Sequence, residues 1–139
     1  MDNQQPIRLP VKLSIRIDWS ELDYFGHVNN VQFYKYIQSA RVNFWEQIGL
    51  RQHHLDKGEG PLLAHCSCDF RKPLEFPGEL HIACGLAHLG NSSFGLKYHL
   101  SNQAAELAAE AEDRMVMFDF HQQRAMRIPD WLRERMLEL

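Results

Sequence analysis

Asp23-Tyr24-Phe25-Gly26-His27-Val28-Asn29-Asn30 marks the junction from which the fold of this chain is predicted. It lies between an alternating strand pattern and a long amphipathic helix pattern, and it places the carboxylate of Asp23 on a turn that leads into a helix start. A helix start offers unpaired backbone N–H groups and a partial positive charge. A carboxylate beside such donors suits attack on a polarised carbonyl, so this junction is the first candidate site.

Both flanks of the junction are periodic. Before it, apolar and polar residues alternate over Val11–Asp18, which predicts a half-buried strand. After it, Asn29 is a candidate N-cap with Gln32 as its capping-box partner, and Gly49 is placed to end the helix. Apolar residues recur at spacings of three and four and form one long face: Phe33, Ile37, Ala40, Phe44 and Ile48. A face of this length needs a sheet to cover it.

The remaining pattern predicts strands between turn signals. After an irregular link over residues 51–60, three alternating runs indicate strands at Leu62–Arg71, Leu80–Leu89 and Phe94–Leu100. Residues 104–118 are ambiguous, because the first half favours helix and the second half favours strand. Residues 129–139 predict a short closing helix. We expect one domain over residues 1–139, with residues 1–10 as a loose lead-in.

Composition excludes several function classes. A net charge of -3 gives no electrostatic basis for binding nucleic acid or an anionic membrane surface. No apolar run approaches the roughly 20 residues that a membrane span needs, and the polar first residues lack the apolar stretch of a secretory signal. We therefore expect a cytoplasmic protein.

Cysteine and histidine residues do not form a recognisable metal motif. The three cysteines, Cys66, Cys68 and Cys84, are an odd number, which argues against a disulfide framework. Cys66 and Cys68 next to His65 could be imagined as a metal site, but this spacing is not that of a zinc module and no second ligand pair follows. We expect the cysteines to be small buried strand residues, and we expect no metal and no cofactor.

The chain resembles the hotdog-fold acyl-CoA thioesterases, in particular the 4-hydroxybenzoyl-CoA thioesterase-like family. The resemblance runs from about Val11 to Trp131, and the stretches that carry it are Arg16–Asp23, Gly26–Asn30, Tyr34, Tyr36, Ala40-Arg41, Asp69–Leu74 and Ser92–Phe94. It implies an α+β hotdog fold, in which a curved antiparallel β-sheet wraps a long central helix. It also implies that residues 104–118 form a strand, and that the chain forms a homodimer or homotetramer with active sites at the subunit interface.

The resemblance implies that Asp23 is the catalytic carboxylate, acting on an acyl-CoA thioester either as a nucleophile or as a general base. The alternative is an aspartate that only caps its turn. Backbone N–H groups near Asn30 and Val31 would hold the oxyanion, and the Asn30 side chain itself would act only indirectly. His27 is a supporting or substrate-contacting residue, or a structural one. Two groups of relatives carry histidine or tyrosine where this chain has Asn30, while many others share the asparagine, so substrate preference cannot be carried over from either group. Both groups have tyrosine where this chain has Phe33, so any role of that hydroxyl does not transfer.

Further residues are candidates for substrate contact. Tyr24, Phe25, Gly26, Val31 and Phe33 surround the catalytic position, although aromatic residues at helical spacing are more often core or dimer contacts. The candidates for binding the phosphates of CoA are Arg71, Lys72 and Lys97, and the candidate hydroxyl donors are Ser92 and Ser93. The alternative is that these residues are simply solvated surface residues.

Two alternative functions stay open at this stage. One is hydrolysis of acyl-carrier-protein thioesters, and the other is a non-catalytic dimer that binds acyl-CoA. A hotdog dehydratase is disfavoured, because its usual Asp/His helix motif is absent from the sequence.

Overall fold

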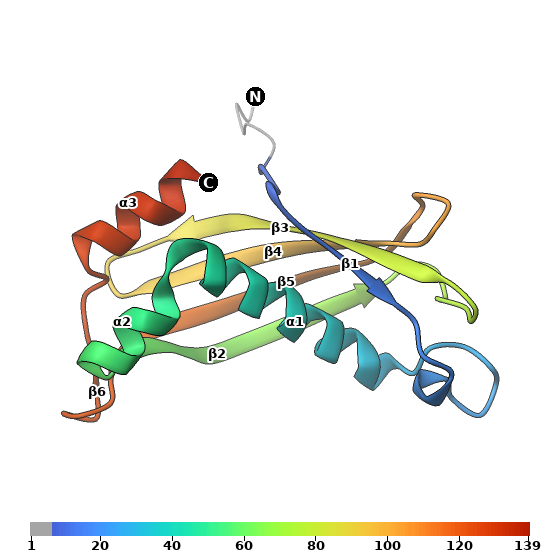
Figure 1. The fold of residues 1–139 in the computed structure, drawn as a ribbon, viewed down its shortest axis with the longest axis horizontal. Helices are drawn as coiled ribbons and strands as arrows, with labels where there is room; N and C mark the ends of the chain where they lie inside the picture. The colour runs from blue at the N-terminus through green and yellow to red at the C-terminus, as the bar shows by residue number, and fades with distance from the viewer. Residues whose placement is uncertain (1–6) are drawn as a thin grey trace.

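A curved antiparallel sheet wraps one long helix in the computed structural model, which describes residues 7–139 (Figure 1). The strand order is β1-β3-β4-β5-β2, and a short β6 pairs with β5. The helix α1, Asn30–Ile48, lies across one face of this sheet. The strands are β1 Val11–Arg16, β2 Glu59–Phe70, β3 Glu79–Leu89, β4 Ser93–Ser101, β5 Leu107–Asp119 and β6 Arg124–Ala125. The predicted architecture of a long helix wrapped by an antiparallel sheet is confirmed.

The ambiguous stretch 104–118 forms a strand from Leu107 onward, as the resemblance implied. β5 pairs with β4 on one side and with β2 on the other. Ala108, Ala109 and Ala111 are buried in this central strand. Pairing on both sides outweighs the helix propensity of the local sequence, because propensity is a weak preference that tertiary contacts override.

The sheet buries the predicted apolar face of α1. Asn29 caps the helix as predicted, since its side-chain oxygen accepts a hydrogen bond from the Val31 N–H at 3.1 Å. The predicted capping box with Gln32 is wrong, because the Asn29 N–H donates to the Glu21 carbonyl oxygen at 2.9 Å instead. Gly49 ends the helix in the left-handed conformation, with φ 75°.

The predicted irregular link over residues 51–60 is wrong. A second helix, α2 (Leu50–Lys57), starts directly after Gly49, and only its first residue, Leu50, is buried. Without an apolar face, α2 lacks the periodicity from which a helix is recognised in a sequence. The closing helix α3 (Asp130–Glu138) is confirmed. Among residues 7–139, no helix is long and apolar enough to cross a bilayer.

One charged side chain is buried between α1 and the sheet. Asp113 on β5 is 4% exposed and accepts hydrogen bonds from Arg41 Nε at 2.9 Å, from the Tyr98 hydroxyl at 2.5 Å and from the Leu96 N–H at 3.1 Å. Burial alone would lower the pKa of the Arg41 guanidinium, but Tyr98 and Asp113 outweigh it and raise that pKa. A buried carboxylate needs such partners, and here they tie the middle of α1 to two adjacent strands.

Replacing Asp113 with alanine is expected to destabilise the protein strongly. The change leaves the Arg41 guanidinium, whose side chain is only 13% exposed, without its partner, and breaking a buried pair typically costs about 3–5 kcal/mol. Urea unfolding of wild type and variant measures this difference in the free energy of unfolding.

The neighbouring Glu112 offers a matched control. It is exposed and lies 4.0 Å from Lys97, so Glu112→Gln should change the free energy of unfolding by less than about 1 kcal/mol. Similar small losses for both variants would show that the buried network does not hold α1 to the sheet.

Candidate active site

Asp23 sits on a tight turn whose geometry depends on its own carboxylate. Its Oδ1 accepts hydrogen bonds from the Phe25 N–H at 2.9 Å and from the His27 N–H at 3.2 Å. Gly26 supplies the left-handed conformation that the turn requires, with φ 85°. The second oxygen, Oδ2, makes no hydrogen bond within residues 7–139 and belongs to an exposed residue. One oxygen therefore shapes the turn while the other is available for chemistry.

The start of α1 follows this turn directly. Of the two expected oxyanion donors, the Val31 N–H is already engaged by the Asn29 side chain at 3.1 Å. The Asn30 N–H makes no hydrogen bond within the described part of the chain. An unpaired N–H at a helix start attracts negative charge. Of the two expected donors, the Asn30 N–H is thus the one that stays open within residues 7–139.

A buried tyrosine ties the turn to α1. The Tyr36 hydroxyl donates to Glu21 Oε1 at 2.9 Å, and the Glu21 carbonyl oxygen accepts the hydrogen bond from the Asn29 N–H. Burial, and then the hydrogen bond to Glu21, raises the pKa of the Tyr36 phenol, so it stays protonated and donates. Sequence reasoning missed Glu21 as a positioning residue. Its spacing from Asp18 was the available signal, because the two form the capping box of the short 3-10 helix Trp19–Glu21.

The other residues of the junction differ in accessibility. Tyr24 and Phe25 are 96% and 81% exposed, with their rings edge to face at 5.3 Å between centroids. His27 Nε2 lies 4.0 Å from Glu75 Oε1 on a partly exposed side chain. Val31 is exposed. Phe33, in contrast, is buried against Phe70 at 5.0 Å between ring centroids, which makes it a core contact within one protomer.

The basic candidates for phosphate binding already have acidic neighbours. Arg71 Nη2 lies 3.1 Å from Glu110 Oε2, and Lys72 pairs with Glu106. The hydrogen bond from Arg71 lowers the pKa of Glu110, and that from Lys72 lowers the pKa of Glu106. Arg71 and Lys72 directly follow the end of β2. This part of the chain lies near the Asp23 turn, because the Val28 N–H donates to the Leu74 carbonyl oxygen at 2.9 Å.

The structure does not bring Ser92 and Ser93 to Asp23. They lie at the turn between β3 and β4, whereas Asp23 follows β1, whose last residue Arg16 pairs with Glu79 at the first residue of β3. The two serines are therefore at the opposite end of the sheet from the Asp23 of the same chain (Figure 1).

The cysteines are free thiols on strands. Cys84 is buried as predicted, but Cys66 and Cys68 are only half-buried, because β2 is the edge strand of the sheet. Burial raises the pKa of all three thiols, that of Cys68 to about 11, so they are protonated at neutral pH. Within residues 7–139, no group of three or more histidine, cysteine or acidic side chains is placed to hold a metal ion.

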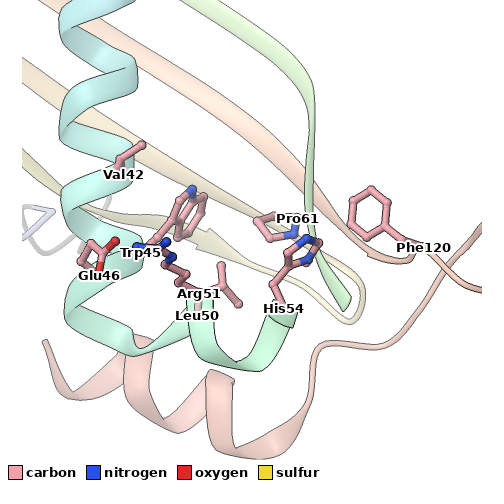
Figure 2. Close-up of a pocket in the computed structure, with 9 residues that line it drawn as sticks. Val42, Trp45, Glu46, Leu50, Arg51, His54, Pro61 and Phe120 are labelled. Carbon is pink, nitrogen blue, oxygen red and sulfur yellow. The ribbon is translucent and has the colours of Figure 1, made fainter. Parts of the chain in front are cut away.

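A cavity of about 430 Å³ lies at the other end of α1, and sequence reasoning did not find it (Figure 2). It is bounded by the last turns of α1, by α2, by the start of β2 and by the residue after β5. Its lining combines residues that are far apart in the chain, so no local pattern could have revealed it. The lining residues are Val42, Trp45, Glu46, Leu50, Arg51, His54, Gly60, Pro61 and Phe120.

Comparison with known proteins identifies the family. The model of the thioesterase-like superfamily matches residues 17–136. The uncharacterized protein YsmA of Bacillus subtilis (strain 168) is 30% identical over 95 residues, which are 68% of this chain and 62% of that protein. The matched region thus spans less than two thirds of that relative's length.

Solved structures share the fold over nearly their whole length. A putative thioesterase from Pseudomonas aeruginosa, PA2801, is 26% identical with a TM-score of 0.82, covering 91% of this chain and 98% of its own. The hypothetical protein TT1821 from Thermus thermophilus is 25% identical with a TM-score of 0.83, covering 93% and 98%. A thioesterase from the same species, complexed with coenzyme A and Zn, has the same fold at 24% identity, with a TM-score of 0.83 and coverage of 94% and 93%.

The family model covers most of the chain, and these structures share its fold over more than nine tenths of its length. The chain therefore belongs to the thioesterase-like superfamily, and it has the hotdog fold that the sequence predicted.

Proposed function

We propose that this protein hydrolyses acyl-CoA thioesters with Asp23 as its catalytic carboxylate. The observation that carries the proposal is that the two oxygens of this side chain have different surroundings. Oδ1 is fixed by two backbone N–H groups. Within residues 7–139, Oδ2 makes no hydrogen bond, and the N–H of Asn30, at the start of the helix that follows this turn, also stays open. A fixed carboxylate next to a preorganised donor is what attack on a thioester carbonyl needs.

The reaction follows from this arrangement. The thioester carbonyl oxygen accepts the Asn30 N–H, which stabilises the negative charge that develops on it. Asp23 Oδ2 either removes a proton from a water that attacks the carbonyl carbon, or attacks that carbon itself to give an anhydride that water then opens. In both routes the C–S bond breaks, and the products are the free acid and the thiol of CoA.

The assembly that we propose is a homodimer formed through β2. This strand is twelve residues long and lies at the edge of the sheet, where its outward backbone groups have no strand partner within residues 7–139. Large apolar residues are exposed along this edge and along the adjacent side of α1: Leu62, Leu63, Phe70, Val31, Tyr34 and Val42. A long, apolar, unpaired edge pairs readily with another strand, and a second antiparallel copy of β2 satisfies it around a two-fold axis.

Arg71 and Lys72 are the residues that we propose for the phosphates of CoA. Their ion pairs with Glu110 and Glu106 are exposed, and exposed pairs are worth only about 0–1 kcal/mol. Phosphate oxygens can therefore replace the carboxylates at little cost. The cytoplasmic location stays a prediction of the sequence.

Asp23→Asn is expected to lower the rate of thiol release from acyl-CoA by at least about a hundredfold, the usual contribution of a general base or more. The amide keeps an oxygen that can accept from the Phe25 and His27 N–H groups, so the turn should remain folded. Asp130→Asn is the matched control, because this exposed aspartate lies on α3, and its side chain pairs with Arg127 at 2.9 Å.

Two results would count against the proposed function. Hydrolysis that Asp23→Asn leaves unchanged would remove Asp23 from the mechanism. Saturable binding of acyl-CoA by the wild type, without release of thiol, would identify the protein as a non-catalytic binder instead.

Tyr36→Phe is expected to lower kcat while leaving KM nearly unchanged. The substitution removes the hydrogen bond from the Tyr36 hydroxyl to the Glu21 carboxylate, and a bond to a charged group is worth about 1.5–3 kcal/mol. A fall of about ten- to a hundredfold is therefore expected if this bond holds the turn in its reactive position. Tyr34→Phe is the control, because the exposed Tyr34 hydroxyl makes no hydrogen bond within residues 7–139. Loss of thermal stability with unchanged kcat at a permissive temperature would show that Tyr36 is structural only.

A further inference from the structure

We propose that a groove on the outer face of the sheet, the face turned away from α1, binds the phosphate group of a small phosphate monoester, and that protonation of His81 strengthens this binding. Within residues 7–139, the lining of the groove contains no acidic side chain. The inference is independent of the proposed function, because every test of it measures binding and none measures hydrolysis. The basic and hydroxyl side chains of the lining are Lys12, Ser14, His81, His99 and Ser101.

The floor of the groove is the small side chain of Ala83. The register of the sheet pairs Ala83 with Lys12 on β1 and with His99 on β4, so a longer basic side chain flanks it on each side. Its neighbour on β3, Ile82, is buried in the core, and successive strand residues face opposite sides of a sheet. Ala83 therefore faces away from α1, and a space of about 370 Å³ lies above it.

A second row of polar side chains lies beside this floor. Ser14 on β1 is opposite His81 on β3, and Ser14 Oγ is 2.7 Å from His81 Nδ1. Ser101 on β4 is opposite His81 on the other side. His81 is two residues from Ala83 along β3, so the two share one face of the sheet. Hydrogen-bonding groups from three strands thus surround the groove.

The charge of His81 decides the direction of its hydrogen bond with Ser14. A neutral ring that carries its proton on Nε2 accepts the Ser14 hydroxyl at Nδ1. A protonated ring instead donates from Nδ1 to Ser14 Oγ, which frees the serine O–H to donate elsewhere. Relative to that neutral ring, protonation adds one positive charge and one free donor. Both favour a bound anion, and histidine is the side chain that changes charge near neutral pH.

The charged side chains around His81 also favour an anion. Lys12 and Arg16 lie on β1, on either side of the position opposite His81, and His99 lies on β4. On β3 itself, Glu79 is two residues from His81, and the register places it opposite Arg16. Two positive charges therefore face one negative charge here, before either histidine gains a proton.

Glu110 balances the β4 side of the groove. Its Oε1 lies 3.2 Å from His99 Nε2, and its Oε2 lies 3.1 Å from Arg71 Nη2. The hydrogen bond from Arg71, with a smaller contribution from the charge of His99, lowers the pKa of Glu110. Glu110 is thus ionised at neutral pH and already has His99 as a neighbour. We therefore assign the larger pH effect to His81, whose ring partner is a neutral hydroxyl.

The size of the groove favours a phosphate monoester over a bare ion. Its volume of about 370 Å³ falls within the roughly 300–1,000 Å³ typical of small-molecule sites. In this assignment the phosphate oxygens accept hydrogen bonds from Lys12, Ser14 and His81. Ala83 and Ala105, which also line the groove, leave apolar space for the organic part of the ligand.

The first test is a titration with sulfate at about pH 6 and about pH 8, at constant ionic strength. Sulfate keeps both negative charges over this range, whereas phosphate gains a proton near pH 6. The NMR signal of the Ala83 backbone amide should shift saturably, with a dissociation constant at least about threefold lower at the lower pH. A shift that does not saturate, or equal affinity at both pH values, would overturn the proposal.

The second test removes the titrating ring. In His81→Gln the affinity for sulfate should no longer depend on pH, because the amide stays neutral. His88→Gln is the matched control: His88 is exposed on the same strand and its Nε2 lies 3.5 Å from Ser93 Oγ, but it is outside the lining of the groove. A pH dependence that persists in His81→Gln, or that disappears in His88→Gln, would contradict the role of His81.

The third test fills the groove without changing any charge. Ala83→Leu places a larger side chain on the floor and leaves the core unchanged, because Ala83 faces away from it. Circular dichroism and thermal unfolding check that the variant is folded. We expect no saturable binding of sulfate at either pH. Binding that survives in the folded variant would show that the ion is held by the general charge of the surface, and would overturn the site.

The last test identifies the ligand class with inorganic phosphate, phenyl phosphate and CoA. Phenyl phosphate should bind more tightly than inorganic phosphate, and equal affinity would contradict the assignment to a monoester. Arg71 and Lys72, the residues proposed for the phosphates of CoA, are outside the lining of the groove. Saturating CoA should therefore leave the affinity for phenyl phosphate unchanged. Displacement of phenyl phosphate by CoA would contradict a separate site.

Discussion

The structure depends on covering one apolar face of α1 over its whole length. Five residues of this face, Phe33, Ile37, Ala40, Phe44 and Ile48, are between 0% and 3% exposed. Burial of each large side chain among them contributes about 1.5–3 kcal/mol. A short element could not cover all five positions along the helix. A sheet that bends around the helix does, and the curved order β1-β3-β4-β5-β2 leaves β2 at its edge. The same constraint thus produces the core, the open edge and the exposed start of the helix.

The catalytic proposal follows from how the chain enters that helix. The turn from β1 must reverse direction and present α1 to the sheet, and the Asp23 Oδ1 stabilises this reversal by accepting two N–H groups. A structural and a catalytic role are often treated as alternatives for such an aspartate. Here they concern different oxygens of one carboxylate, so the turn that fixes Oδ1 also fixes where Oδ2 points. Tyr36 and Glu21 extend this support into the core.

The sequence was informative where periodicity reflects burial. The strand before Asp23, the face of α1 and its end at Gly49 could be predicted because each repeats or interrupts an apolar pattern. The helix α2 could not be predicted, because Leu50 is its only buried residue and its sequence therefore has no apolar periodicity. The prediction of a capping box with Gln32 was wrong, because the Asn29 N–H donates to the carbonyl oxygen of Glu21. Glu21 lies outside the helix pattern from which the capping box was predicted. Local patterns cannot reveal a competing acceptor from another element.

In the candidate site, too, only the features that lie within one short stretch of sequence could be predicted. Asp23 and the helix start are contiguous in the chain, so their association could be predicted. The ion pairs of Arg71 and Lys72 depend on the register between β2 and β5, which pairs Phe70 with Ala109. The cavity depends on the approach of α1, α2 and β2, and no short stretch contains more than part of its lining. Contacts set by tertiary packing could therefore be found only in the structure.

The most direct measurement is a crystal structure with a decanoyl-CoA analogue in which a methylene group separates the sulfur from the carbonyl, so that the bond cannot be hydrolysed. We expect the ketone oxygen to accept a hydrogen bond from the Asn30 N–H, and the carbonyl carbon to face Asp23 Oδ2. An analogue bound with its carbonyl away from Asp23 would contradict the proposed catalytic role of this residue.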